Sequence, residues 1–267
     1  MSFAKQYGPW AVVAGASEGV GRAFARKLAA RGVPSILVAR REESLTALAA
    51  EIRAESGLEC IAAAIDLSAP DAAQQLMAAV GDRYVGLFVC NAGSDPNGAH
   101  FLDRDIGAWT ELVQRNVTTM MQASHLLAQG MRARGKGGLL LVNSGACYGG
   151  ASFMAAYAAS KAFMLCFSEG LWAELKPYGV DVLTLVLGIT DTPALRTLLA
   201  AKGLPLPSSA ASPDDVAEMG LARLAHGPIH NWGQADDVAG YAPNSPDQRR
   251  ARIQIVDASS KHVFGER

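Results

Sequence analysis

A tyrosine and a lysine four residues apart suggest proton-transfer chemistry. Tyr157 and Lys161 lie in a segment with a helical pattern, so their side chains share one face of the helix. A free phenol has a pKa of about 10 and is a poor base at neutral pH, but a neighbouring ammonium favours the phenolate and lowers that pKa. Tyr157 could then protonate a carbonyl oxygen or deprotonate an alcohol. A packed core tyrosine beside a solvated lysine is the alternative.

A serine at the end of an apolar run could serve the same reaction. Ser144 ends the run Leu-Leu-Leu-Val-Asn-Ser, which predicts a strand whose carboxyl end faces a ligand. Its hydroxyl could hold the substrate oxygen on which Tyr157 acts, or it could cap a helix or a turn. We do not expect a nucleophile, because Ser144 lies outside any G-x-S-x-G motif and has no histidine near it in sequence.

A glycine loop joins the first predicted strand to the first predicted helix. Its spacing is G-x-x-x-G-x-G, and in a doubly wound fold this turn binds a dinucleotide. Glycines let the backbone approach the pyrophosphate, and the helix N-terminus offers unpaired N–H groups. A tight turn without a ligand would also use glycines. The loop residues predicted to contact a cofactor are Gly15, Ser17, Glu18, Gly19, Val20 and Gly21.

The residues after the second predicted strand bear on the choice of cofactor. An acidic side chain there would accept the ribose hydroxyls of NAD, but Arg40 and Arg41 follow the strand, and the first acid, Glu42, belongs to the next helix. Arginine forms charge-assisted hydrogen bonds to a 2′-phosphate, so the sequence favours NADP(H). Two ordinary surface arginines at a helix start are the alternative.

Short apolar runs alternate with helical patterns as far as about residue 190. Runs that are apolar throughout are typical of strands covered on both faces, and the alternation predicts an α/β fold with a doubly wound, mostly parallel sheet. The predicted strands are Trp10–Ala14, Ser35–Ala39, Cys60–Asp66, Gly86–Asn91, Leu139–Ser144 and Val180–Leu187. The predicted helices are Gly19–Arg31, Glu42–Glu55, Pro70–Val80, Ile106–Arg134 and Ala155–Lys176.

No linker separates parts of the chain, so we expect one domain over residues 1–267. The stretch from about 190 to 212 is apolar yet broken by glycine and proline, which predicts a helical flap over something apolar. The pattern loosens after about residue 227, and a C-terminal extension at about 245–267 is expected to include a helix over Pro246–Ser260.

Composition excludes several classes of function. Half of the 267 residues are hydrophobic and 18% are charged, and the 24 basic and 25 acidic side chains form no basic block, so we expect no nucleic-acid partner. The four cysteines form no C-x-x-C motif, which predicts reduced thiols and no metal site. Without an evident signal peptide or membrane-crossing run, a cytoplasmic protein with no membrane contact is expected.

Together these motifs resemble those of the short-chain dehydrogenase/reductase family, over nearly the whole chain. The resemblance implies a Rossmann fold and a hydride transfer between a nicotinamide and a substrate carbon. Tyr157 would move the proton, Lys161 would hold the ribose and lower the tyrosine pKa, and Ser144 would orient the substrate oxygen. Asn116 would position a water in a proton relay behind the lysine.

The same resemblance implies further contacts with the cofactor. Asp66, with Leu67 beside it, would touch the adenine, and the loop after the sixth strand would hold the carboxamide. Besides Tyr157 and Lys161, the remaining implied contacts are Asn91, Ala92, Gly93, Gly188, Thr190 and Thr192.

Four positions depart from the family pattern, although none removes a group that performs chemistry. Ala14 replaces a threonine, Cys90 replaces an asparagine and Leu187 replaces a proline. Glu18 stands where many NADP enzymes carry a basic residue, which weakens the preference for NADP(H).

Several short segments are similar to those of microbial NADP-dependent hydroxysteroid dehydrogenases of the 7β type, among them Tyr7-Gly8-Pro9-Trp10 and the loop from Leu187 to Pro193. Flap leucines would suit a bulky apolar substrate, or they could pack against the domain itself. These leucines are Leu195, Leu198, Leu199, Leu204 and Leu206. Further candidates for pocket lining are Cys147, Tyr148, Phe153 and Met154.

The leading interpretation is an NADP(H)-dependent oxidoreductase that interconverts a secondary alcohol and a ketone on a bulky hydrophobic, steroid-like substrate. A non-catalytic NADP-binding sensor or scaffold, and a reductase of 3-ketoacyl or other small carbonyl substrates, remain alternatives. Epimerase, lyase and dehalogenase relatives are less compatible with the intact glycine loop. The resemblance also implies a homodimer or homotetramer formed through the helices at Ile106–Arg134 and Ala155–Lys176.

Overall fold

Apolar strands covered on both faces build the core of the molecule. The structure is a computed structural model, which describes residues 2–95, 98–148, 150, 152–232, 247–248 and 250–251. Within these residues, the strands form one seven-stranded sheet in the order β3-β2-β1-β4-β5-β6-β7, and all neighbouring strands are parallel. The strands are β1 (Trp10–Ala14), β2 (Ser35–Ala39), β3 (Cys60–Ala64), β4 (Val85–Cys90), β5 (Gly137–Ser144), β6 (Val180–Leu187) and β7 (Ile229–Asn231).

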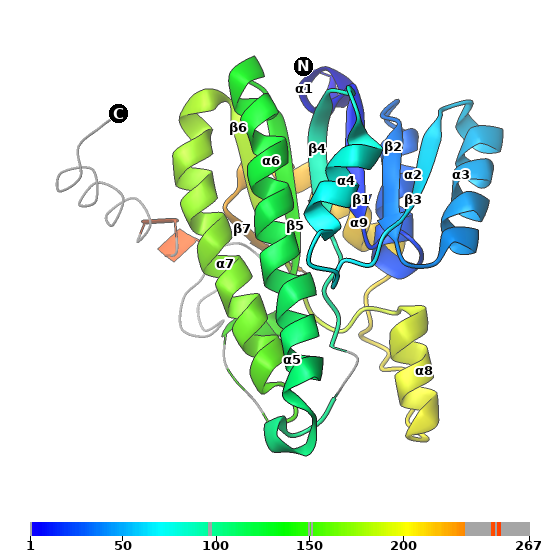
Figure 1. Cartoon of the computed structure of the whole chain (residues 1–267), viewed down its shortest axis with the longest axis vertical. Coiled ribbons are helices and arrows are strands. Elements are labelled where there is room, and N and C mark those ends of the chain that lie inside the picture. The colour runs from blue at the N-terminus through cyan, green and yellow to red at the C-terminus, as the bar shows by residue number, and fades with distance from the viewer. Residues whose placement is uncertain are drawn as a thin grey trace.

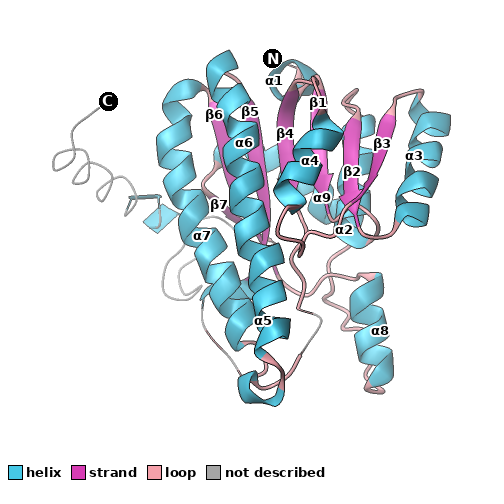
Figure 2. Cartoon of the chain, in the orientation of Figure 1, coloured by secondary structure: helices cyan, strands magenta, loops and turns pink. Residues whose placement is uncertain are grey.

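Helices cover both faces of this sheet (Figures 1 and 2). One face carries α2 (Gly19–Ala29), α3 (Glu42–Ser56) and α9 (Pro213–Arg223), and the other carries α4 (Ala72–Val80), α6 (Thr119–Arg134) and α7 (Ala155–Leu175). The doubly wound single-domain fold predicted from the alternation of apolar runs is therefore confirmed.

The expected strands differ from the observed ones mainly at their ends. β3 ends at Ala64 rather than Asp66, and β5 begins at Gly137, two residues earlier than expected. Three elements were not expected: α1 (Phe3–Tyr7), α9 and β7. The helix expected over Pro246–Ser260 lies largely outside the described residues.

The single helix expected over Ile106–Arg134 consists of three parts. These are α5 (Ile106–Val113), a π-helical turn η2 (Gln114–Thr118) and α6. A π turn holds an extra residue and changes the direction of the side chains that it carries, and such turns are frequent at functional sites. Here it carries Asn116, whose side-chain amide donates a hydrogen bond to Ser160 Oγ at 3.2 Å.

The predicted flap includes α8 (Pro193–Ala201), which projects away from the carboxyl edge of the sheet (Figure 1). None of the residues of α8 is buried. Leu198 in α8 is 53% exposed, and Leu204 in the loop after it is 54% exposed. The flap leucines therefore do not pack into the core of the domain. No helix within the described residues is both long and apolar enough to cross a membrane.

Candidate active site

Parallel strands place their carboxyl ends at one edge of the sheet, and the predicted site residues follow these ends. Asn91 comes directly after β4, while Ser144 ends β5 and is paired in register with Leu187 at the end of β6. Tyr157 and Lys161 lie in the first turns of α7, which packs on β5 and β6. The topology thus brings together residues that are far apart in the sequence.

Lys161 is buried at the centre of this group. Only 4% of the residue is exposed, and its Nζ lies 5.7 Å from the centroid of the Tyr157 ring. The ammonium donates to the carbonyl oxygen of Val142 at 3.2 Å. Burial disfavours the charged form and lowers the pKa of Lys161 to about 8.

The pKa of Tyr157 departs from the expectation that Lys161 lowers it. Burial raises the pKa of this half-buried phenol, and a hydrogen bond with Ser144 counteracts the rise. In this structure the contact that favours the phenolate is the hydrogen bond with Ser144. The ammonium of Lys161 lies over the tyrosine ring and donates to the carbonyl oxygen of Val142.

Asn116 lies close to the lysine, since both side chains approach Gly93. Its Oδ1 is buried and has no hydrogen-bond partner within the described residues. A Cβ on Gly93 would come within 3.1 Å of Lys161 Nζ and 3.5 Å of Asn116 Oδ1, so only a glycine leaves this space open. A free buried acceptor costs stability unless a donor reaches it, which a bound water could supply.

The glycine loop is held against the end of β4. Asn91 Nδ2 donates to the carbonyl oxygen of Gly15 at 3.0 Å. Gly15 has a φ of +80°, and a Cβ on Gly21 would overlap its carbonyl oxygen. These close contacts require glycine and keep the start of α2 accessible to an anion. Ser17, Glu18, Gly19 and Val20 complete the turn.

The two arginines after β2 have different surroundings. Arg41 bonds back to the glycine loop, with 2.5 Å to a Glu18 carboxylate oxygen and 3.2 Å to Ser17 Oγ. Arg40 is exposed and forms no ion pair within the described residues. Arg40 is thus the arginine available to a 2′-phosphate, whereas Arg41 is already neutralised by Glu18.

The segment after β3 forms a tight turn. Asp66 Oδ1 accepts hydrogen bonds from the backbone N–H and the hydroxyl of Ser68, at 3.0 and 2.6 Å. These bonds lower the pKa of Asp66. Leu67 follows and is buried. Asp66 is therefore a fixed carboxylate beside the end of β2.

The loop after β6 approaches the glycine loop from the other side. Gly188 accepts a 3.4 Å hydrogen bond from Thr190, which bridges to Ala211. Thr192 accepts a bond from the Leu195 N–H and caps α8, and its side chain lies over Gly19, where a Cβ would meet it at 3.1 Å. Thr192 thus lies near the start of α2.

The proposed lining residues have diverse environments. Cys147 is buried, and Tyr148 donates to Asn231 Oδ1 at 2.8 Å. Phe153 has a φ of +67°, rare for a bulky side chain, and its ring packs at a tilt against His100 with centroids 3.9 Å apart. Met154 is 36% exposed. His100 and Asn231 carried no signal in the sequence, because only the fold brings them to these partners.

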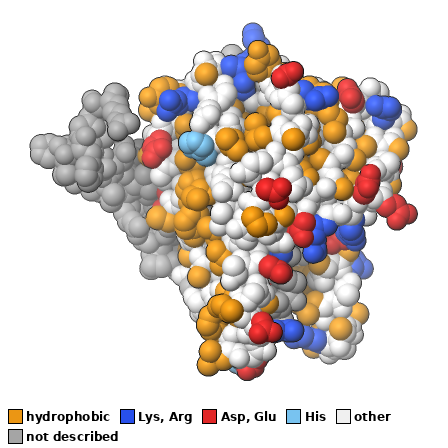
Figure 3. Space-filling model, viewed as in Figure 1, with side chains coloured by type: hydrophobic (Ala, Val, Ile, Leu, Met, Phe, Trp, Pro, Cys, Tyr) orange, Lys and Arg blue, Asp and Glu red, His pale blue; other side chains and the backbone are white. Residues whose placement is uncertain are grey.

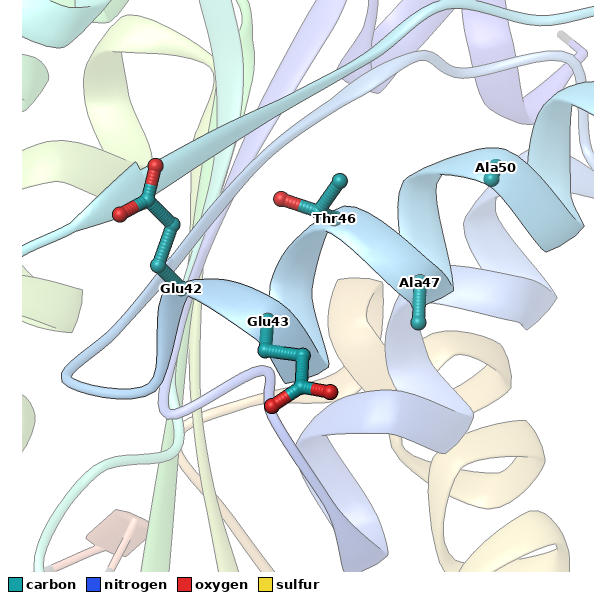
Figure 4. Close-up of a pocket in the computed structure, with 5 residues that line it drawn as sticks. All are labelled: Glu42, Glu43, Thr46, Ala47 and Ala50. Carbon is teal, nitrogen blue, oxygen red and sulfur yellow. The ribbon is translucent and has the colours of Figure 1, made fainter.

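A second hollow among the described residues lacks this combination of groups. A hollow of about 690 Å³ on the outer side of α3 is lined by Glu42, Glu43, Thr46, Ala47 and Ala50 (Figure 4). It contains neither a basic side chain nor a group suited to proton transfer at neutral pH. Among the described residues, no cluster of histidine, cysteine, aspartate or glutamate could hold a metal ion.

The arrangement fits a dinucleotide. The open cradle at Gly93, the exposed Arg40 and the accessible start of α2 together offer a space for a ribose, a cation for a phosphate and free N–H groups. Tyr157 and Ser144 lie beside that cradle.

Comparisons with known proteins agree with this geometry. The family model described as "short chain dehydrogenase" matches residues 9–203. A 7beta-hydroxysteroid dehydrogenase of Clostridium sardiniense is 34% identical over 226 residues, which is 84% of this chain and 85% of that protein. A human protein named inactive hydroxysteroid dehydrogenase-like protein 1 is 33% identical over 184 residues, 68% of this chain and 56% of that protein.

Solved structures of related proteins have a similar fold. A structure from a study of 7beta-hydroxysteroid dehydrogenase stereoselectivity superposes with a TM-score of 0.81 at 28% identity, covering 98% of this chain and 95% of that one. A short-chain dehydrogenase from Sphingobium yanoikuyae in complex with NADPH superposes with a TM-score of 0.77 at 25% identity, covering 97% and 96%.

Proposed function

The chain belongs to the short-chain dehydrogenase family, and from this premise we propose that it is an NADP(H)-dependent oxidoreductase. It interconverts a secondary alcohol and a ketone on a bulky hydrophobic, steroid-like substrate. The observation that carries the proposal is the convergence of Ser144, Tyr157, Lys161 and Asn116 beside the cradle at Gly93.

Each of these side chains has a role that follows from its position. The bound nicotinamide supplies or accepts the hydride. Ser144 holds the substrate oxygen and, through its bond with Tyr157, favours the phenolate. Tyr157 donates its proton to that oxygen during reduction and takes it back during oxidation. Lys161, fixed by Val142, holds the ribose, and the free Oδ1 of Asn116 accepts from a water that returns protons to the lysine.

The preference for NADP(H) rests on charge. Arg40 is an exposed cation at the end of β2, where a 2′-phosphate would lie, and no carboxylate occupies that position in the sequence. Glu18 reduces the preference because it neutralises Arg41. The NADPH-bound relative of similar fold supports this choice.

The flap supports a large apolar substrate. Its leucines are exposed or half-buried on α8 and on the loop after it, and they could close over a hydrophobic ligand. The names of the 7beta-hydroxysteroid dehydrogenase relatives point to a steroid. We also propose a cytoplasmic homo-oligomer without nucleic-acid or membrane partners.

The test is a substrate screen. Purified protein is incubated with NADPH or NADP⁺ and a panel of 7-keto and 7-hydroxy steroids, other hydroxysteroids, bulky ketones and small 3-ketoacyl esters, while NADPH absorbance is followed. Turnover restricted to the bulky substrates is expected. A preference for 3-ketoacyl esters would replace the steroid assignment with the small-carbonyl alternative.

Tyr157→Phe removes the proton donor and leaves the ring in place. We expect this variant to bind NADPH as the unmodified protein does, while kcat falls by about 10² to 10⁴-fold. Binding is measured by quenching of tryptophan fluorescence and turnover by NADPH absorbance. Unchanged turnover would refute the role of Tyr157.

A non-catalytic NADP-binding protein is the second candidate. The human relative named inactive favours it, because it shows that a protein of this similarity can lack activity. Tight NADPH binding without turnover of any substrate in the panel would support this candidate, and turnover that depends on Tyr157 would eliminate it.

A further inference from the structure

A helix turn far from the glycine loop in sequence is fastened to the segment after β3. Thr119, at the start of α6, donates its hydroxyl hydrogen to the carbonyl oxygen of Leu67 at 2.8 Å, and both residues are buried. Arg115 lies four residues before Thr119, in the π turn η2, and its guanidinium is close enough to Asp66 for their charges to interact. Arg115 is therefore held near Asp66 and Leu67.

The Arg115 guanidinium has an unusual environment for an arginine. Its NH2 group donates to the carbonyl oxygen of Ser94 at 3.1 Å, while its Nε is buried and has no hydrogen-bond partner within the described residues. Burial lowers the pKa of Arg115, and repulsion from Arg40 lowers it further. Attraction to Asp66, Glu111 and Asp95 offsets part of this cost.

Two guanidinium groups thus approach one carboxylate. Arg40, from the end of β2, and Arg115, from η2, both act on Asp66 and help to lower its pKa. Neither of them lies within ion-pair distance of Asp66, whose Oδ1 is bonded to Ser68. Arg40 and Arg115 are thus both near Asp66 without pairing with it directly. This arrangement leaves both guanidinium groups able to contact a ligand bound beside Asp66.

We propose that Arg115 packs the face of its guanidinium against the adenine ring of bound NADP(H). This inference rests on the proposed function and adds a residue to the cofactor site. One Nη of the guanidinium is bonded to Ser94 and its Nε is buried, so these two edge positions do not reach a ligand, whereas stacking uses the flat face. Arginine is weakly hydrated and stacks well on aromatic rings, whereas the exposed Arg40 keeps its donors for the 2′-phosphate.

The test measures binding rather than activity. Dissociation constants of NADP⁺, NAD⁺ and nicotinamide mononucleotide are determined by calorimetry for the unmodified protein and for Arg115→Leu, Arg115→Lys and Arg40→Leu. Arg115→Leu and Arg115→Lys are expected to weaken NADP⁺ and NAD⁺ by similar factors of about 5 to 30, because both contain adenine and only a planar cation stacks. Nicotinamide mononucleotide should bind unchanged, and Arg40→Leu should weaken NADP⁺ far more than NAD⁺.

Controls make the outcome decisive. Arg53→Leu, at an exposed arginine near the end of α3, should leave all three constants unchanged. Thermal unfolding verifies that each variant is folded, and Arg115→Lys replaces Arg115→Leu if the latter is not. A loss confined to NADP⁺ would place Arg115 on the 2′-phosphate and overturn the proposal, as would no loss at all. Failure of the unmodified protein to bind either dinucleotide would instead reject the proposed function.

Discussion

The buried Lys161 makes the free energy of unfolding depend on pH. The pKa of Lys161 is about 8 in the folded protein, whereas a lysine in the unfolded chain has the ordinary value of 10.5. Between these two pH values the unfolded chain therefore binds more protons than the folded chain. Stability therefore rises as the pH increases from about 8 to 10.5, and the cost of burying the ammonium is fully present below about pH 8. A residue needed for catalysis is here expected to reduce stability.

Replacing this lysine should reveal that cost. We expect Lys161→Met to raise the free energy of unfolding of the cofactor-free protein by roughly 1 kcal/mol or more near neutral pH, and to abolish turnover. The gain should shrink as the pH rises above about 8 and disappear above about 10.5, where the lysine is largely neutral in both the folded and the unfolded chain. Urea unfolding at several pH values measures it, with Lys5→Met, at an exposed lysine, as the control. A destabilised Lys161→Met variant below pH 8 would contradict this account.

Residue types predicted which side chains gather at the candidate site better than they predicted the electrostatics there. The motif placed Tyr157, Lys161 and Ser144 in one site, because their spacing and strand positions are local properties of the sequence. It did not predict that burial would raise the Tyr157 pKa, nor that Arg115 would lie near Asp66. Both depend on which atoms the fold packs around a side chain, which a single sequence does not specify.

At the scale of elements, the apolar central strands were predictable and the three-residue strand β7 was not. β1, β2 and β6 match the expected bounds, because strands buried on both faces are apolar throughout. β7 has only three residues, and two of them, His230 and Asn231, are polar and buried. α1 has five residues and no periodic pattern to detect. The π turn was also missed, and Asn116 within it and Thr119 after it make tertiary contacts that the sequence does not specify.

The exposed leucines of the flap separate substrate binding from stability. Leu198→Ser and Leu204→Ser remove apolar surface that contributes little to the core, so the melting temperature should change by no more than about 2 °C. If the flap closes over a hydrophobic substrate, KM should rise by about 5 to 50-fold while NADPH affinity is retained. Steady-state kinetics with the best steroid or ketone of the panel measure this. Met219→Ser on α9 is the matched control, and an equal rise in its KM would contradict a role for the flap.

At the scale of the whole molecule, one broad surface lies away from the site. α6 and α7 run side by side over the sheet (Figure 1), and a groove of about 520 Å³ between them is lined by Met121, Cys166 and Gly170 among others. Figure 3 shows hydrophobic side chains at the surface over α7. Met121 and Phe163 are each 39% exposed, and Phe163 stacks on Phe167. A second copy of the chain could bury this surface, in keeping with the proposed homo-oligomer.

Gly170 gives a selective test of that assembly. It is exposed on α7, and a Cβ there would meet no atom of the same chain, so Gly170→Glu should not disturb the isolated subunit and should even favour the helix by about 1 kcal/mol. In an oligomer packed through α6 and α7, the same change introduces a buried charge into the contact. We expect light scattering to show dissociation of Gly170→Glu at concentrations where the unmodified protein and Ala50→Glu, an exposed position on α3, remain assembled. If Gly170→Glu keeps the oligomer intact, the subunits must associate through another surface.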